Sequence, residues 1–237
     1  MSEILSVKNL SVSFNGQKVL DDLSFSVDKG DILAVIGPNG AGKSVLFRAL
    51  LGLIPYKGEV RWNLTGEAVS EASVRVGYVP QKISVDRDLP LSVAELLNYG
   101  GASKKEIKEL LGEVGLEKEI LNKRIGILSG GQWQRLLIAW ALISNPEILL
   151  FDEPTAGIDI GGEETIYNLI KRLQRERNMT VLLISHDLHI VYRYAKDVLC
   201  LNKEKICLGP PHEVLDKESL AKLYGHETAV YPHTHHK

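Results

Sequence analysis

The stretch "DILAVIGPNGAGKS" (residues 31–44) decides the fold of this chain. Its first half is a continuous apolar run, which is typical of a strand buried on both faces of a sheet. Its second half fits the pattern G-x-x-x-x-G-K-[ST], in which glycines let backbone N–H groups turn toward phosphate oxygens. A helix is expected to follow, from Lys43 to about Leu53. The stretch therefore predicts a strand, a phosphate-binding loop and a helix, in that order.

The side chains of this loop indicate how it would hold a nucleotide. Lys43 can reach the β and γ phosphates, the Ser44 hydroxyl can bind Mg²⁺, and the helix N-terminus adds a dipole that favours anions. The residues expected to form the cradle are Gly37, Pro38, Asn39, Gly40, Ala41, Gly42, Lys43 and Ser44. A glycine-rich turn with a chance lysine is the competing interpretation, and the strand before the loop and the helix after it disfavour it.

Composition and charge narrow the class of protein. Of the 237 residues, 44% are hydrophobic and 24% are charged, which is typical of a globular domain large enough to bury a sizeable core. The formal net charge of −2 disfavours nucleic acid held by bulk electrostatics, so we expect no nucleic-acid partner. The sequence contains no apolar run of about 18 residues that would span a membrane. Its start, "MSEILSVKNL", lacks the features of a secretory signal.

The pattern of apolar residues divides the chain into regions. Period-two alternation in residues 1–30, with Asn-Gly and Lys-Gly between the runs, predicts short antiparallel strands. "PEILLFDEP" (146–154) and "TVLLISHD" (180–187) read as strands on either side of a helical stretch, and this alternation implies a parallel sheet covered on both sides. Residues from about 90 to 145 have a helical texture. This block is therefore predicted to be a subdomain inserted into the sheet region.

Two acids and a histidine are expected at strand ends near the loop. Asp152, at the end of "ILLFDE", would reach Mg²⁺, and Glu153 would polarise the attacking water. His186 ends another apolar strand, and because parallel strands end at one edge of a sheet we favour a contact with the γ-phosphate. The competing interpretations are acids that cap a strand before Pro154 and a structural histidine.

A second phosphate cradle is indicated by "LSGGQWQR" (residues 128–135). Ser129 is a good helix N-cap, and Ser129-x-x-Gln132 fits a capping box. Gly130 and Gly131 leave the start of the helix bare, so backbone N–H groups and the helix dipole could hold an anion. Taken alone, the same four residues are equally compatible with nothing more than a capped helix.

Together these residues resemble the ATP-binding cassette (ABC) ATPases, over nearly the whole chain. "GPNGAGKS" resembles the family's Walker A motif, "ILLFDE" its Walker B motif, "LSGGQ" its signature motif and "AGID", which ends at Asp159, its D-loop. Gln81 in "YVPQ" matches the Q-loop, and His186 matches the switch histidine. Phe14 lies where the family places an aromatic residue that stacks on adenine.

The resemblance implies a fold, an activity and an assembly. The fold would be an α/β P-loop NTPase (RecA-like) with a parallel sheet core, an N-terminal antiparallel β subdomain and an inserted helical subdomain. The activity would be ATP hydrolysis with ATP and Mg²⁺, the ion being held by Ser44, Gln81 and Asp152. Family members form head-to-tail homodimers in which the signature motif of one subunit closes on the γ-phosphate held by the other. Residues 128–132 would then serve the partner's ATP.

A finer resemblance concerns residues 78–100 and 181–215, which are similar to the ATPases of zinc/manganese-type metal importers. It implies a subunit that powers import of a divalent metal ion, zinc or manganese, at the cytoplasmic face of the cell membrane. Its partners would be integral membrane permease subunits and an extracytoplasmic metal-binding protein. Because Gln81 can touch the magnesium site and the residues after it lead into the helical region, we expect a helix of the permease to dock around Gln81 and Ser84–Tyr99. The alternatives are a soluble ABC ATPase, such as an iron–sulfur assembly factor, and an importer of another substrate.

Two features depart from the family pattern. Val45 stands where the family usually has threonine, so a hydroxyl donor to the α-phosphate is missing while the backbone N–H of that position remains. Trp133 and Trp140 occupy positions often held by polar or basic residues, and would either pack inside the helical subdomain or meet a partner. Cys200 and Cys207 are expected to be two apolar strand positions rather than a disulfide.

The last residues, 226–237, are predicted to be a tail outside an ATPase domain that spans 1–225. Four of the seven histidines lie in this tail: His226, His233, His235 and His236. The tail is either a solvated polar end or a segment whose neutral imidazoles bind zinc, a metal that accepts nitrogen donors.

Overall fold

A computed structural model describes residues 2–64, 67–68, 75–81, 86, 88–154 and 160–224. Several predicted features lie outside these residues. They are Asp159 with the rest of its loop, much of the segment that follows Gln81, and the four histidines of the tail.

The N-terminal region is a four-stranded antiparallel sheet with the order β2-β1-β4-β5. Its strands are β1 (Glu3–Phe14), β2 (Gln17–Asp28), β4 (Lys57–Leu64) and β5 (Glu67–Ala68). Asn15 and Gly16 both have positive φ (49° and 77°), as a two-residue hairpin turn of the type that suits strand twist requires. The strands are antiparallel as expected, but β1 and β2 have 12 residues each and are not short.

A six-stranded sheet forms the centre of the molecule, with the order β10-β9-β3-β8-β7-β6. Its strands are β3 (Ile32–Ile36), β6 (Val76–Val79), β7 (Ile148–Asp152), β8 (Thr180–Ile184), β9 (Asp197–Asn202) and β10 (Glu204–Gly209). All neighbouring pairs are parallel except β9 and β10. Every residue of β3, β7 and β8 is buried, as their continuous apolar runs predicted.

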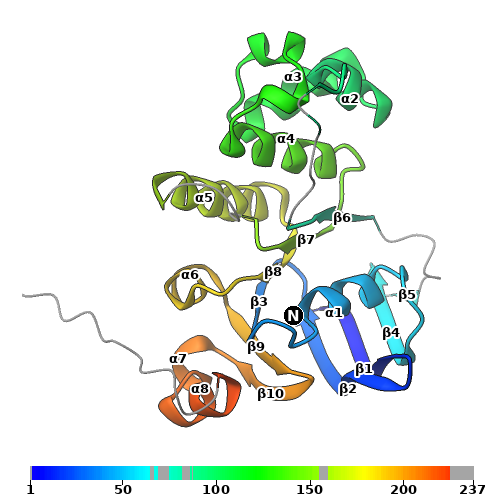
Figure 1. Cartoon of the computed structure of the whole chain (residues 1–237), viewed down its shortest axis with the longest axis vertical. Coiled ribbons are helices and arrows are strands. Elements are labelled where there is room, and N and C mark those ends of the chain that lie inside the picture. The colour runs from blue at the N-terminus through cyan, green and yellow to red at the C-terminus, as the bar shows by residue number, and fades with distance from the viewer. Residues whose placement is uncertain are drawn as a thin grey trace, which may run out of the picture.

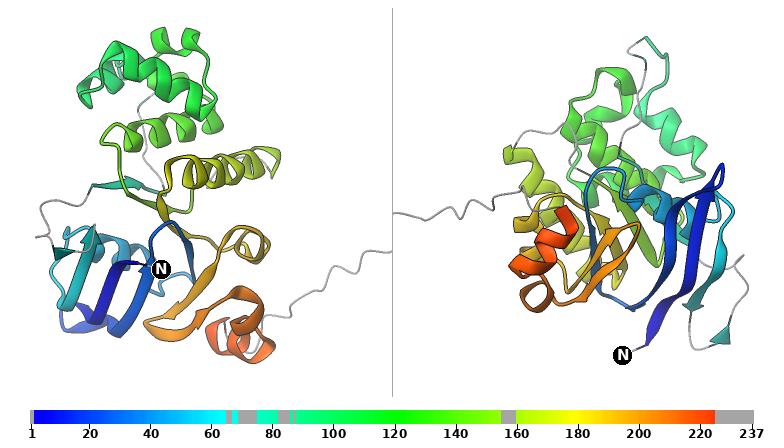
Figure 2. Two further views of the ribbon diagram at one scale, coloured as in Figure 1. Left: turned by 180° about the vertical axis from the view of Figure 1, so that it is seen from behind. Right: turned by 60° about the horizontal axis from the view of Figure 1, so that its bottom comes forward.

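Apart from α1, the helices form one group at each end of the molecule, with α5 between the first group and the six-stranded sheet (Figures 1 and 2). Those of the first group, at one end of the molecule, are α2 (Val93–Tyr99), α3 (Lys104–Val114), η2 (Lys118–Asn122), η3 (Ile125–Ile127) and α4 (Gly130–Leu142). We call this group the helical block. Between it and the six-stranded sheet lies α5 (Ile160–Arg177), and the C-terminal group consists of α6 (Leu188–Tyr194), α7 (Pro211–Val214) and α8 (Lys217–Tyr224).

Helix α1 (Lys43–Leu50) follows the phosphate-binding loop and ends earlier than the expected Leu53. Gly52 takes the left-handed conformation (φ 66°), and its N–H donates to the carbonyl of Ala49. The N–H of Leu53 reaches back to the carbonyl of Arg48, which completes a glycine-terminated C-cap. The helix therefore ends where a glycine was available to close it.

Alternate residues of the central strands belong to different apolar clusters. Val181 and Leu183 pack with the helical block and α5, whereas Leu182 and Ile184 pack with α1 and the N-terminal sheet. Because side chains of a strand alternate between its faces, the sheet is covered on both sides. The carboxyl ends of its parallel strands meet at one edge, where the loop after β3 also lies.

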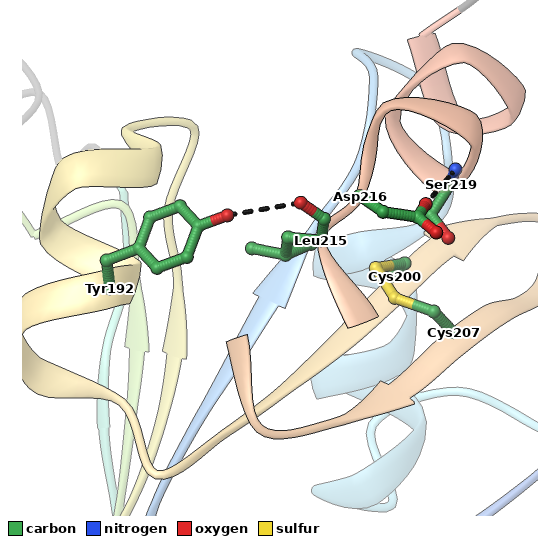
Figure 3. Close-up of a disulfide and its surroundings, with 6 residues drawn as sticks. All are labelled: Tyr192, Cys200, Cys207, Leu215, Asp216 and Ser219. Atoms are coloured by element: carbon green, nitrogen blue, oxygen red, sulfur yellow. Dashed lines mark hydrogen bonds between the residues drawn. A yellow bond between two sulfur atoms is a disulfide. The ribbon is translucent and has the colours of Figure 1, made fainter. Parts of the chain in front are cut away.

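The two cysteines are joined by a disulfide, so the expectation of two apolar strand positions rather than a disulfide is wrong about the disulfide. Cys200 in β9 and Cys207 in β10 are direct antiparallel partners, with their Cα atoms 4.8 Å apart (Figure 3). That distance lies within the range a disulfide can bridge. The expected strand positions are observed, but the register that brings the sulfurs together follows from the hairpin.

Candidate nucleotide-binding and catalytic site

The loop between β3 and α1 is shaped by close approach of the rest of the chain. A Cβ on Gly37 (φ 155°) would lie 2.0 Å from the backbone oxygen of Leu201, and one on Gly42 (φ 97°) would lie 2.6 Å from Leu20 Cδ2. Glycine is therefore required at both positions. The loop lies between β9 and β2, and the hairpin from β1 to β2 carries Phe14 at its turn end, where its side chain is exposed.

Lys43 lies across this loop. Its Nζ donates to the backbone oxygens of Gly37 (2.8 Å) and Pro38 (3.0 Å). The side chain is buried, and burial lowers the pKa of its amino group, while the carboxylates of Glu153 and Asp152 act in the opposite direction. The predicted cradle thus exists as a folded loop whose lysine satisfies its own carbonyls.

The remaining residues of the loop are placed as follows. Asn39 and Gly40 are exposed at its tip, and Ala41 is buried, its N–H donating to Pro38 O (3.2 Å). Ser44 and Val45 begin α1 and are half-buried. Val45 packs against the apolar cluster of α1 and the N-terminal sheet.

Asp152 ends β7 at the edge of the sheet and is almost fully buried. Burial raises the pKa of its carboxyl, while hydrogen bonds from the hydroxyls of Ser44 and Tyr78 lower it. The Tyr78 hydroxyl donates to Asp152 Oδ2 at 3.4 Å, and burial is the first cause that raises the pKa of Tyr78 to about 12. Tyr78 was not predicted, and its place in β6, beside β7, is what brings it here.

Glu153 lies at the centre of the predicted catalytic group. Its backbone takes a positive φ of 47°, which is uncommon outside glycine and concentrates at functional sites. Its Oε2 accepts a hydrogen bond from Gln81 Nε2 at 2.5 Å and lies 3.9 Å from Nδ1 of His186. The His186 side chain is 73% exposed. The sheet edge therefore brings together Gln81, Asp152, Glu153 and His186, which come from three strand ends.

The second cradle begins α4 in the helical block. Ser129 is the N-cap, and its Oγ accepts from the N–H of Gln132 at 3.3 Å. Gln132 Oε1 in turn accepts from the N–H of Ser129 at 3.2 Å, so the predicted capping box is confirmed. Gly130 and Gly131 are the first two residues of the helix, and a Cβ on Gly131 would meet no atom within 4 Å. A cavity of about 450 Å³ opens beside Ser129 and Gln132.

The two unusual tryptophans differ in surroundings. Trp133 packs partly buried against the apolar cluster of the helical block. Trp140 is half-buried and lines a groove of about 400 Å³ between β6 and the helical block. The other residues that line this groove include Tyr78, Gly100, Gly101 and Ile143.

The residues at the first loop fit a nucleotide and Mg²⁺. A Cβ at Gly37 or Gly42 would collide with Leu201 or Leu20, so glycines let the loop wind closely around the buried ammonium group of Lys43, which suits a phosphate. The oxygen atoms of Ser44, Asp152 and Gln81 are hard ligands of the kind that Mg²⁺ prefers.

Among the helices of the described residues, none has the length and hydrophobicity that a membrane span requires.

Sequence and structure comparisons define the class of protein. The ABC transporter family matches residues 20–156, which is more than half of the chain. The chain belongs to the ABC transporter family, as its ATP-binding and ATP-hydrolysing component.

Particular relatives refine this class. The chain is 41% identical to the zinc import ATP-binding protein ZnuC of Pseudomonas entomophila, over 98% of this chain and 89% of that one. It is 40% identical to the zinc import ATP-binding protein ZnuC of Yersinia pestis, over 99% of this chain and 92% of that one.

Solved structures show the same fold. An inward-facing putative metal-chelate type ABC transporter has a TM-score of 0.81 and 30% identity, over 94% of this chain and 89% of that one. The ADP conformation of MJ1267, an ATP-binding cassette of an ABC transporter, has a TM-score of 0.82 and 27% identity, over 96% of this chain and all of that one. The predicted family and fold class are confirmed, and so is the prediction of an ATP-hydrolysing enzyme.

Proposed function

We propose that this chain is the ATP-hydrolysing subunit of an ABC importer of zinc. The observation that carries the proposal is the identity of about 40% to zinc import ATP-binding proteins over nearly the full length of both chains. Such coverage includes helices α5 to α8, which lie beyond the segment that the family as a whole matches. The same relatives favour zinc over manganese and over the iron–sulfur alternative.

In this proposal the first loop binds the phosphates of ATP. Lys43 would leave the carbonyls of Gly37 and Pro38 for the β and γ phosphates, since a buried ammonium group without an anion has only its own loop to bond. Ser44, Gln81 and Asp152 would hold Mg²⁺, which neutralises charge on the phosphates. Phe14 would stack on the adenine, and Val45 would contribute its backbone N–H.

Glu153 would polarise the attacking water, and His186 would contact the γ-phosphate. The structure shows the Glu153 carboxylate accepting a hydrogen bond from the amide nitrogen of Gln81. That bond leaves the amide oxygen of Gln81 available to Mg²⁺. Gln81 would therefore link the bound metal to the base, so that the position of Glu153 responds to nucleotide.

The second cradle would complete the site of another copy of the chain. Ser129, Gly130, Gly131 and Gln132 would bind the γ-phosphate held by the partner in a head-to-tail homodimer, with Asp159 beside the shared site. The open space in front of Gly131 supports this arrangement, because nothing in the same chain occupies it among the residues described. Two such sites would form in each dimer.

The partners in the membrane would be permease subunits, bound from the cytoplasmic face. Trp140 and Tyr78 line the groove described above, and Tyr78 shortly precedes Gln81 in the sequence. Tyr99, whose side chain is 90% exposed, directly precedes Gly100, another residue that lines the groove. Tyrosine is enriched at protein interfaces, because its ring packs against a partner while its hydroxyl finds a hydrogen bond. A metal-binding protein outside the membrane would deliver the ion in the complete system.

Transport in vesicles tests the proposal. The chain, co-purified with its membrane partners, would be placed in liposomes, and ATP-dependent uptake of radioactive Zn²⁺ measured with Mn²⁺ as competitor. We expect zinc uptake that excess Mn²⁺ does not abolish and that Glu153→Gln eliminates. Preferential uptake of Mn²⁺, or purification from membranes without any membrane partner, would contradict the proposal.

A further inference from the structure

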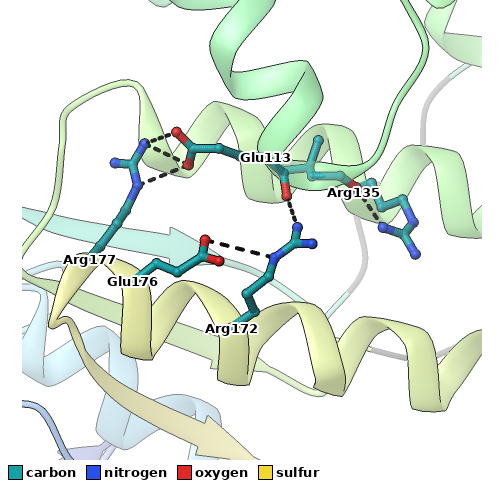
Figure 4. A network of polar contacts seen from close by, with 6 residues as sticks. Glu113, Arg135, Arg172, Glu176 and Arg177 are labelled. Atoms are coloured by element: carbon teal, nitrogen blue, oxygen red, sulfur yellow. Dashed lines mark hydrogen bonds and ion pairs between the residues drawn. The ribbon is translucent and has the colours of Figure 1, made fainter.

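Three arginines hold the C-terminal end of α3 (Figure 4). Arg177 binds the Glu113 carboxylate with two nitrogens, Nη2 at 2.8 Å from Oε1 and Nε at 3.0 Å from Oε2. Arg172 donates to the backbone oxygen of Glu113, and Arg135 Nη1 donates to the backbone oxygen of Val114 at 2.5 Å. We call this set of contacts the arginine clamp.

The clamp suits the chemistry of a helix end. The last carbonyls of a helix lack partners within the helix and carry its negative dipole end, so guanidinium donors are favourable there. The pair of Glu113 and Arg177 is bidentate and mostly buried, with 32% and 23% of the side chains exposed. It is therefore stronger than an exposed surface pair, which contributes little.

The clamp also joins two parts of the molecule. Arg172 and Arg177 lie on α5, which packs on the six-stranded sheet, whereas Glu113 and Arg135 belong to the helical block. Arg135 lies on α4, the helix that begins at the second cradle. The end of α3 is thus tied both to α5 and to the helix that presents Ser129.

We propose that Glu113, Arg172 and Arg177 are positioning residues that fix the orientation of the helical block on α5, and with it the second cradle. The proposal rests on the proposed function, in which Ser129 acts on the partner's ATP. ATP binding by the single chain depends on the first loop, which the clamp does not touch. Losing the clamp therefore impairs assembly of the two-chain site and leaves binding by one chain intact.

Variants of the clamp give a first test. We expect Glu113→Gln and Arg177→Met to lower turnover at saturating ATP about fivefold and to weaken the ATP-dependent dimer. The affinity of the single chain for ATP should stay unchanged. Arg177→Lys keeps the charge but loses the bidentate geometry, so its turnover should lie between that of the parent and that of Arg177→Met.

A matched control lies on the same helix. Glu164 of α5 accepts from Arg193 of α6 at 2.5 Å, so Glu164→Gln makes the same chemical change in an ion pair that does not reach the helical block. It should leave turnover and dimerisation unchanged. Because Glu113 and Arg177 act through each other, the double variant should lose no more turnover than the worse single variant.

Thermal unfolding separates this role from a purely structural one. Clamp variants that melt earlier but keep full turnover and dimerisation would overturn the proposal, and so would additive losses in the double variant. Ser129→Arg, measured in parallel, tests the premise that the second cradle acts on the partner's ATP. If Ser129→Arg keeps full activity, the proposed action of the second cradle fails, whatever the clamp variants do; if it is inactive and the clamp variants are normal, only the clamp proposal fails.

Discussion

The two phosphate cradles are built in opposite ways. The first is enclosed by its own chain: Lys43 bonds to the loop's carbonyls, and no Cβ fits at Gly37. The second is open: Ser129 and Gly130 are exposed, and nothing lies within 4 Å of where a Cβ on Gly131 would be. The difference teaches that the shape of the first cradle is fixed by contacts within one chain. The second cradle is open on its outer side, as expected of a surface that contacts a second molecule.

Because of this contrast, variants of the first cradle and variants of the second cradle should show different defects. A change at the first cradle should be visible in a single chain, as altered nucleotide binding or altered stability. A change at the second should leave the single chain intact and appear only when chains assemble with ATP.

The largest effect is expected at Glu153. Glu153→Gln should lower turnover by about a thousandfold, because the water loses its base while both cradles remain. Nucleotide binding should persist, and the ATP-bound dimer should accumulate because it cannot resolve by hydrolysis. Phosphate release and the mass of the complex with ATP are the measurements. Turnover close to that of the parent would remove Glu153 from this role.

Ser129→Arg should reduce hydrolysis by at least about a hundredfold in the homodimer, since a bulky cation would fill the anion site that meets the partner's phosphate. Binding of ATP by the single chain should be normal, as the contrast between the cradles requires. Mixing this variant with Lys43→Ala should restore one intact composite site in each mixed dimer. Recovery of activity on mixing is the decisive readout, and full activity of Ser129→Arg alone would show that the second cradle does not act across an interface.

A matched pair of glycine substitutions compares the two cradles directly. Gly37→Ala should cost about 2 kcal/mol of stability and abolish nucleotide binding, because its methyl group would collide with the Leu201 carbonyl. Gly131→Ala meets open space in a helix, so it should raise stability by up to about 1 kcal/mol and leave single-chain binding unchanged. Thermal unfolding and a nucleotide titration distinguish the two. Equal losses in both variants would mean that the cradles do not differ as described.

The smallest effect concerns Val45. Val45→Thr should tighten ATP binding by about 0.5–1.5 kcal/mol, the value of one hydrogen bond, if the missing hydroxyl is the deficit. Val45 packs against the apolar cluster of α1, so the hydroxyl could instead disturb that contact. Val45→Ala is the control, because it removes the packing without adding a donor. Weaker binding by both variants would show that the packing of the valine matters more than the absent hydroxyl.

Much of the fold and of the second cradle was predictable because both follow from local patterns. The buried strands β3, β7 and β8 are continuous apolar runs, and the capping box of Ser129 and Gln132 is a four-residue signal. The end of α1 was predicted too late in the sequence, although Gly52 follows the helix and glycine commonly ends helices. The roles of the site residues remain predictions.

The features that were not predicted depend on contacts between distant segments. The disulfide requires the register of β9 against β10, and the hydrogen bond from Tyr78 to Asp152 requires that β6 lie beside β7. The arginine clamp joins residues about sixty positions apart, Glu113 and Arg177, whose pairing no local period encodes. Strand order and helix packing, rather than composition, bring these groups together.

The position of Trp140 gives the molecule its own optical reporter. Among the three tryptophans of the chain, Trp62 is buried in the N-terminal sheet and Trp133 packs inside the helical block, whereas Trp140 lines the groove beside β6. A helix seated in that groove would exclude water from the indole ring and shift its fluorescence emission to shorter wavelength. Association with a membrane partner can thus be followed in real time, without an attached dye, by the shift that Trp140 contributes to the tryptophan emission of the chain.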